Sequence, residues 1–178
     1  MGAEAESLDR AIEALRRQLG SDRVLAGATA AGEIRQRSLN PDDLAALRYV
    51  VRPRNTEECR IAVQTLSEFG PAIVAGLTTF WEPHASDPGV GIDTLALGDP
   101  RRVDAPERIG YFGAGVSVRD ADRLARAQGL CVPAYPDSDG SQSLGSLAAV
   151  ACTTGLGMGR HEPVEQIAGL TVVTGDAT

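Results

Sequence analysis

The sequence predicts an α/β or α+β protein, because short hydrophobic segments alternate with stretches of helical periodicity. Apolar residues recur at helical spacing in three segments, 8–19, 56–69 and 117–128. Short runs rich in Val and Ile, bounded by Gly or Pro, indicate strands at 49–53, 72–75 and 90–95. With 178 residues and a hydrophobic fraction of 43%, the chain can form one domain or two small lobes sharing a core.

The first expected element is an amphipathic helix. Its apolar stripe follows the spacing i, i+4, i+7 and i+11, and consists of Leu8, Ile12, Leu15 and Leu19. Gly20 ends this helix. Residues 26–47 are less regular, because Gly27, Gly32 and Asn40-Pro41 interrupt any long element. We expect loops there, with room for one helical turn.

A strand, a helix and a second strand are expected next. The run Y-V-V-R-P at 49–53 is a short strand stopped by Pro53, which lacks a ladder donor. Asn55 or Thr56 caps the helix, and Glu58 stands in capping-box position relative to Asn55. Its inward face would carry Cys59, Ala62, Val63, Leu66 and Phe69. Gly70-Pro71 ends the helix, and A-I-V-A at 72–75 begins the next strand.

The second half of the chain repeats this alternation. We expect strands in V-G-I-D-T-L at 90–95 and in R-I-G-Y-F-G-A-G at 108–115. Ser117, with Asp120 three residues on, caps a helix that ends before Gly129 and turns Val118, Ala121, Leu124 and Ala125 inward. After the bend V-P-A-Y-P, residues 144–152 are expected to form a helix of small residues, and 167–174 a terminal strand.

Charge and hydropathy exclude several classes of protein. The net charge of -7 opposes a general nucleic-acid role, because phosphate binding needs clustered cations. All 17 basic residues are arginine, which excludes a P-loop lysine, a Schiff-base lysine and a lysine general base. No run approaches the roughly 18 apolar residues of a membrane span. The acidic start lacks the features of a secretion signal, so we expect a cytoplasmic protein without a transmembrane segment.

The cysteines and histidines indicate neither a disulfide framework nor a metal site. The chain has only three cysteines, an odd number too scattered for a disulfide framework: Cys59, Cys131 and Cys152. Cys131 and Cys152 are interpreted as inert core thiols, because small apolar residues surround them in the sequence. His84 and His161 have no partner at metal-ligand spacing. No nucleophile elbow or catalytic triad is recognisable, so the catalytic residues stay unknown.

Two glycine clusters bear on nucleotide binding. Gly113-Ala114-Gly115 follows an expected strand and precedes a capped helix, as a dinucleotide-binding fingerprint would. However, Val118 replaces the third glycine, and no acidic residue ends a strand about 20 residues on. An NAD-binding module is therefore the weakest alternative. The second cluster, G-L-G-M-G at 155–159, indicates by itself only a flexible loop.

The order and spacing of these motifs resemble the FAD-binding domain of the vanillyl-alcohol oxidase / p-cresol methylhydroxylase (PCMH-type) flavoprotein family, which includes the D-lactate and glycolate dehydrogenases. The resemblance covers about residues 45–176. Its segments are, in order, V-V-R-P-R-N-T-E-E-C, A-I-V-A-G-L-T-T, G-V-G-I-D, Y-F-G-A-G-V-S-V, G-L-C-V-P-A-Y-P, D-S-D-G-S-Q-S-L-G-S-L-A-A-V-A-C-T-T-G and G-L-T-V-V-T-G-D.

The resemblance implies an α+β protein with the PCMH-type FAD-binding fold: two small α/β lobes with mixed sheets flanked by helices. Residues 1–48 would form an N-terminal helical arm, and 49–178 the FAD-binding domain. The first lobe would span about 49–98, and the second, incomplete lobe about 99–178. Family members continue with further strands and a substrate domain over the flavin. A partner subunit or a missing substrate domain is therefore implied.

The implied cofactor is non-covalent FAD, held by turns whose backbone N–H groups approach the diphosphate. The first loop, 75–79, and the segment 143–146 would take the diphosphate, while 155–159 and 167–169 would approach the flavin or adenine. The implied cofactor-binding residues are Ala75, Gly76, Leu77, Thr78, Thr79, Pro136, Ser143, Leu144, Gly145, Ser146, Gly155, Gly157, Gly159 and Ile167.

The chain also departs from the family pattern. The family's first loop typically reads Arg-Gly-Gly-Gly-Thr, but here Leu77 and Thr78 replace two glycines and Ala75 replaces the arginine. A bulky residue adopts positive φ only at a cost. The second glycine pair is Gly145-Ser146, and no histidine in the first loop could link flavin covalently.

Two functional hypotheses follow. The first is a flavin-binding domain or subunit of an FAD-linked oxidoreductase that oxidises a small 2-hydroxy acid or alcohol by hydride transfer to flavin. The second is a fold that has lost flavin and serves a structural, assembly or regulatory role. The first is the leading hypothesis, and the lost glycines and the short length are the grounds for the second.

Overall fold

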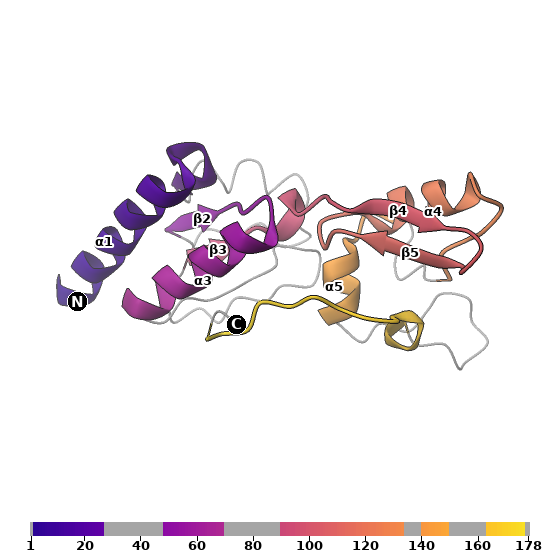
Figure 1. Ribbon diagram of the computed structural model, residues 1–178. Coiled ribbons are helices and arrows are strands. Elements are labelled where there is room, and N and C mark those ends of the chain that lie inside the picture. The colour runs from indigo at the N-terminus through magenta and orange to yellow at the C-terminus, as the bar shows by residue number, and fades with distance from the viewer. Residues whose placement is uncertain (1, 27–47, 70–89, 134–139, 150–162, 177–178) are drawn as a thin grey trace. The chain divides into compact units, whose positions relative to one another are not determined.

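The computed structural model describes residues 2–26, 48–69, 90–133, 140–149 and 163–176 (Figure 1). The chain divides into two compact units. The first unit comprises Met1–Ala96 and Val172–Thr178, and the second comprises Leu97–Thr171. Each unit is described by itself below.

The first unit contains a small mixed sheet of strands β1 (Val24–Ala26), β2 (Tyr49–Val51) and β3 (Val90–Ile92), in the order β1-β2-β3. β1 pairs antiparallel with β2, whereas β2 pairs parallel with β3, Val51 lying opposite Ile92. A parallel pair needs a crossover, and helix α3 (Thr56–Phe69) lies in this one. The structure confirms the predicted strands at 49–53 and 90–95, each shortened to three residues.

The strand β1 was not predicted, because V-L-A is too short to show a periodic pattern. It follows helix α1 (Gly2–Leu19) and the 3-10 turn η1 (Ser21–Arg23). Gly20, at φ 99°, separates these two elements. Only glycine adopts this conformation without cost, so the residue expected to end the first helix does so.

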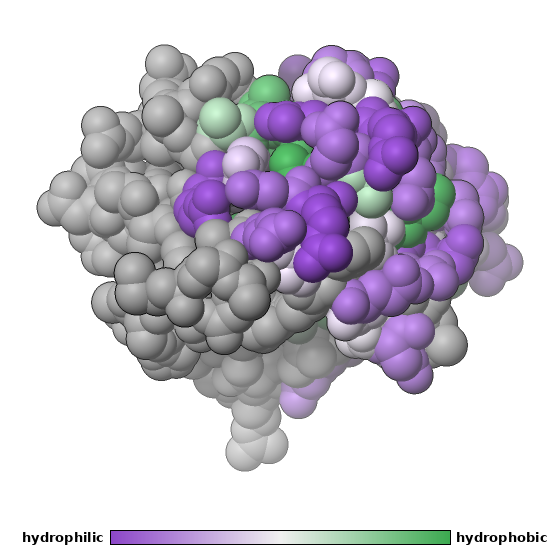
Figure 2. All heavy atoms as spheres, turned by 90° about the vertical axis from the view of Figure 1, so that its left-hand side faces the viewer, coloured by the Kyte–Doolittle hydropathy of each residue, from purple (hydrophilic) through white to green (hydrophobic). Residues whose placement is uncertain are grey.

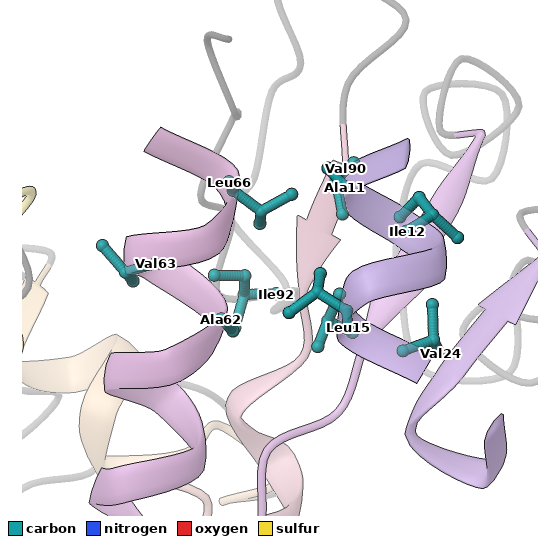
Figure 3. Close-up of a cluster of buried hydrophobic side chains, with 10 residues drawn as sticks. Ala11, Ile12, Leu15, Val24, Ala62, Val63, Leu66, Val90 and Ile92 are labelled. Carbon is teal, nitrogen blue, oxygen red and sulfur yellow. The ribbon is translucent and has the colours of Figure 1, made fainter. Parts of the chain in front are cut away.

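Helices α1 and α3 pack together over the sheet, and their apolar stripes meet in one core (Figure 3). Figure 3 shows Leu66 and Ala62 of α3 and Leu15 of α1 on the facing sides of the two helices, with Ile92 of β3 between them. Full burial of one such aliphatic side chain contributes about 1.5–3 kcal/mol. The buried core consists of Ala11, Ile12, Leu15, Val24, Val51, Ala62, Val63, Leu66, Val90 and Ile92. The predicted face of α1 is therefore confirmed, as is that of α3 at Ala62, Val63 and Leu66, whereas Cys59 is only half-buried and lies outside this core.

The start of α3 is capped by side chains on both sides of the first turn. The Asn55 Oδ1 atom accepts a hydrogen bond from the Glu58 N–H at 2.8 Å. The Glu58 carboxylate in turn accepts from the Arg54 N–H at 2.8 Å. The predicted cap at Asn55 is therefore confirmed, with the N–H of Arg54 as the second donor in place of that of Asn55.

The second unit contains a hairpin of β4 (Arg101–Asp104) and β5 (Ile109–Phe112), paired antiparallel with Arg101 opposite Phe112. β5 confirms the strand expected within 108–115. The sequence gives little sign of β4, because three of its four residues are charged and show no apolar alternation.

Two helices follow the hairpin, α4 (Val118–Arg126) and α5 (Leu144–Ala149), and then the 3-10 turn η4 (Pro163–Gln166). The Ser117 Oγ atom accepts from the Asp120 N–H at 3.0 Å, which confirms the predicted cap of α4. The buried Asp122 carboxylate accepts from the Val132 N–H at 3.0 Å and from Arg126 Nε at 2.6 Å. Asp122 therefore ties the segment after α4 to the helix.

The predicted terminal strand at 167–174 is wrong: this segment has no strand structure and no ladder partner among the described residues. Its Leu170 and Val172 side chains are each 62% exposed. A run of β-favouring residues becomes a strand only when another strand takes its hydrogen bonds, and local sequence does not supply that partner. The predicted strand at 72–75 lies outside the described residues.

One face of the surface is mostly polar where its residues are described. On the face shown in Figure 2, hydrophilic residues predominate and hydrophobic ones occur in isolated patches. Apolar residues scattered in this way are normal on a protein surface.

Candidate functional site

The structure describes five of the fourteen predicted cofactor-binding residues. Ser143–Ser146 lie at the start of α5, and the half-buried Ile167 follows η4. The other nine lie outside the described residues: Ala75, Gly76, Leu77, Thr78, Thr79, Pro136, Gly155, Gly157 and Gly159.

Two motifs that are far apart in the sequence are hydrogen-bonded to each other in the second unit. We call residues 113–119 and 140–147 the paired segments. Four backbone N–H···O bonds join them: Leu144 to Val116 and Gly145 to Ala114, both at 2.8 Å, and Val118 to Gln142 and Arg119 to Gly140, both at 2.9 Å. Ser117 and Ser143 also face each other in an antiparallel bridge. The G-A-G turn and the S-L-G-S segment thus form one structural unit.

The first backbone N–H groups of α5 are engaged within the chain. The N–H groups of Leu144 and Gly145 donate across the paired segments, and that of Ser146 donates to Ser143 Oγ at 3.2 Å. A cradle for an anion needs N–H groups that are free to point at it. In this conformation, a diphosphate at this segment would need donors other than these three groups.

Close packing accounts for the two glycines that stand out in the paired segments. A Cβ atom on Gly113 would lie 2.3 Å from the Leu97 carbonyl oxygen. A Cβ atom on Gly145 would lie 2.9 Å from Ala114 Cβ and 3.0 Å from the Ala114 oxygen. Both glycines are therefore needed because neighbouring backbone approaches closely.

The dinucleotide-fingerprint interpretation of Gly113-Ala114-Gly115 is wrong. The N–H groups of Gly113 and Gly115 each donate at 2.8 Å to carbonyl oxygens of the same unit, those of Pro100 and Leu97. The strand before the turn belongs to an antiparallel hairpin, whereas the fingerprint requires a parallel βαβ unit.

Gln142 is a site residue that the sequence did not indicate. Its side chain is buried, with 1% of the residue exposed, and its Nε2 donates to Ser146 Oγ at 3.3 Å. Its Oε1 atom is buried and has no hydrogen-bond partner. No periodicity or motif in G-S-Q-S-L marks this glutamine as buried, because its neighbours are polar and small.

A cleft of about 760 Å³ lies in the same unit, between the hairpin, the end of α4 and residues 129–133. Ile109 and Phe112 contribute apolar surface, and Arg126 lies on its lining. Cys131 also lines this cleft and is exposed, so its interpretation as a core thiol is wrong. Among the described residues, no group of three metal-ligating side chains is present.

The two described cysteines should differ in reactivity. Cys59 is half-buried on α3, and burial raises the pKa of its thiol, which keeps it protonated and unreactive. We expect iodoacetamide to alkylate Cys131 in the native chain well before Cys59, as measured by peptide mass spectrometry over time. In denaturant the two rates should converge. Equal rates in the native chain would contradict the burial of Cys59.

Comparisons with known proteins agree with this fold. The family model described as "FAD binding domain" matches residues 47–178. Two crystal forms of alkyldihydroxyacetonephosphate synthase are structurally similar. One gives a TM-score of 0.65 at 18% identity, covering 82% of this chain and 29% of that one. The other gives 0.52 at 19%, covering 61% and 22%. No curated protein sequence matches the chain.

These matches confirm the α+β class and the PCMH-type FAD-binding fold expected from the motifs. The chain spans less than a third of the length of the solved structures that it resembles. None of the described helices is both long and apolar enough to cross a membrane. Because the family match covers most of the sequence, the chain belongs to the FAD-binding-domain family, whose cofactor is FAD.

Proposed function

We propose that this chain is the flavin-binding domain or subunit of a cytoplasmic FAD-dependent oxidoreductase, which oxidises a small 2-hydroxy acid or alcohol by hydride transfer to flavin. A further domain or partner chain would supply the substrate site. The observation that carries the proposal is the family match across residues 47–178. The motif order that resembles D-lactate and glycolate dehydrogenases supports the substrate class.

The length of the chain supports the need for a partner or further domain. The structurally similar alkyldihydroxyacetonephosphate synthase chains are more than three times as long as the part that this chain covers. In the proposed arrangement, FAD supplies the redox chemistry, and this chain binds and orients it.

The paired segments fit such a cofactor in a specific way. Gly145 allows the start of α5 to lie against Ala114, where a side chain would collide. Gln142 in the same segment holds a buried acceptor atom without a partner, which a bound molecule with a hydrogen-bond donor could satisfy. From the family resemblance, the proposed cofactor contacts also include Ser143–Ser146, the first loop at 75–79, the loop at 155–159, Pro136 and Ile167.

Purified protein is expected to carry a visible flavin band, or to take up equimolar FAD in calorimetry. FAD at 100 times its Kd should stabilise the chain by about 2.7 kcal/mol. That corresponds to a rise in melting temperature of roughly 5–11 °C for a protein of this size. Colourless protein that ignores added FAD would instead favour the flavin-free alternative.

A substitution in the first loop tests the proposed diphosphate contact. Gly76→Trp places a bulky side chain where the family pattern has close backbone approach, so FAD affinity should fall sharply. Calorimetric titration of FAD measures the change, and circular dichroism checks the fold. Unchanged affinity in a folded Gly76→Trp variant would remove this loop from the proposed site.

A further inference from the structure

We propose that Gln142 binds a sugar-type hydroxyl group of FAD, on its ribityl chain or its ribose, and that the paired segments face that part of the cofactor rather than the diphosphate. The inference rests on the proposed function, because it concerns the same cofactor. It deepens that function by assigning a contact to a residue that is not among the implied cofactor-binding residues.

The first observation is the burial of an unsatisfied acceptor. Only 1% of Gln142 is exposed, and its Oε1 atom has no hydrogen-bond partner. Buried side-chain oxygens are nearly always hydrogen-bonded, because an unsatisfied one keeps its full desolvation cost. An exception of this kind in a cofactor-binding domain indicates a group that is completed by a ligand.

The second observation is that Gln142 is held in place by its neighbours. Its backbone oxygen accepts from the Val118 N–H at 2.9 Å, and its Nε2 donates to Ser146 Oγ at 3.3 Å. The backbone of the residue is thus part of the paired segments, and one end of its amide is already used. The oxygen is the part of the side chain that is left for a further partner.

The chemistry of this atom selects the part of FAD that can meet it. A carbonyl oxygen only accepts hydrogen bonds. At neutral pH the diphosphate also has only acceptor oxygens, so the two groups would repel each other. FAD has donors in its ribityl and ribose hydroxyls, in its flavin N3–H and in its adenine amino group; the hydroxyls are the most numerous of these and would satisfy Oε1.

The backbone of the same segment leads to the same conclusion. The N–H groups of Leu144, Gly145 and Ser146 already donate within the chain. The segment therefore offers an acceptor, whereas a diphosphate requires donors. Because Oε1 is buried in this structure, contact with FAD requires the Gln142 side chain or the residues that cover it to move.

Gln142→Met tests the contact, because methionine has a similar volume and no carbonyl group. We expect its affinity for FAD to be about tenfold weaker, the effect of one lost hydrogen bond. Its melting temperature without FAD should stay within about 3 °C of wild type, because the loss of the bond to Ser146 is offset by removal of the unsatisfied oxygen. The matched control is Gln128→Met, which changes an exposed glutamine of the same unit.

Competition against FAD then locates the contact. Riboflavin presents the ribityl hydroxyls without phosphate, ADP presents the ribose, and inorganic pyrophosphate presents neither. The inference is supported if Gln142→Met lowers the affinity for riboflavin or ADP by about the same factor as the affinity for FAD. Wild type and variant should then bind pyrophosphate with equal affinity. The fragment that is affected distinguishes the riboflavin half of FAD from the adenosine half. The Gln142 side-chain amide resonance should also shift when FAD is added.

Other outcomes separate this inference from the proposed function. If wild type binds FAD and Gln142→Met binds it equally well, the inference is wrong and the proposed function stands. If the substitution lowers the affinity for pyrophosphate, the diphosphate lies at Gln142 and the inference is wrong. Wild-type protein that binds no FAD would overturn both.

Discussion

Gly113→Ala is expected to lower the melting temperature of the FAD-free chain by roughly 6–12 °C, which corresponds to about 3 kcal/mol. The added Cβ atom would lie 2.3 Å from the Leu97 oxygen and 2.7 Å from the backbone N and O of Asp99. These neighbours are backbone atoms, so no side-chain rotation relieves the collision. The hydrogen bonds from Gly113 to Pro100 and from Gly115 to Leu97 would be strained together.

Gly169→Ala is the matched control for this prediction. Gly169 lies in the same unit, and a Cβ atom there would meet nothing within 4 Å. The melting temperature of the Gly169→Ala variant should stay within about 2 °C of wild type, as expected for a surface change. Both variants are compared by thermal unfolding followed by circular dichroism. Equal melting temperatures would show that the backbone around Gly113 yields easily.

Asp93→Ala is expected to lower the free energy of unfolding by about 3 kcal/mol. Asp93 is 2% exposed, and its Oδ2 accepts from Arg52 Nε at 2.8 Å. Its Oδ1 accepts from the Leu95 N–H at 3.0 Å. The substitution therefore removes the acceptor of two donors, one of them a cation whose side chain is only 22% exposed.

The exposed pair of Glu57 and Arg60 provides the control. These residues form a bidentate contact on α3, and the Arg60 guanidinium lowers the pKa of the Glu57 carboxyl. Glu57→Gln should leave the urea unfolding curve unchanged, because water screens an exposed pair. A loss for Asp93→Ala as small as that for Glu57→Gln would show that the Arg52 contact is equally dispensable. Asp93→Asn, which keeps an acceptor for Leu95, should lie between the two.

Local sequence was sufficient for the helices of this protein. The stripe from Leu8 to Leu19 and the caps at Asn55 and Ser117 depend on spacing within a few residues, so they could be predicted without the rest of the fold. The strands were harder to predict. β1 is too short, and β4 too charged, to show the alternation of apolar and polar residues that marks a strand. Residues 167–174 have the composition of a strand but no partner strand among the described residues.

The candidate site shows the same division. The order of the motifs was enough to indicate an FAD-binding domain, and the family match agrees. It was not enough to assign roles to individual atoms. Gly113 and Gly145 look like phosphate-binding glycines in the sequence, but in the tertiary structure each is required where neighbouring backbone comes close.

The sequence by itself determined the helices, their caps and the family, because each depends on residue types at fixed spacing along the chain. Only the tertiary structure brought Gln142 into a buried position beside the G-A-G turn, engaged the N–H groups of Leu144, Gly145 and Ser146, and left Oε1 without a partner. The physical reason is that hydrogen-bond satisfaction depends on which distant segments meet, and that pairing has no periodic signature in the sequence.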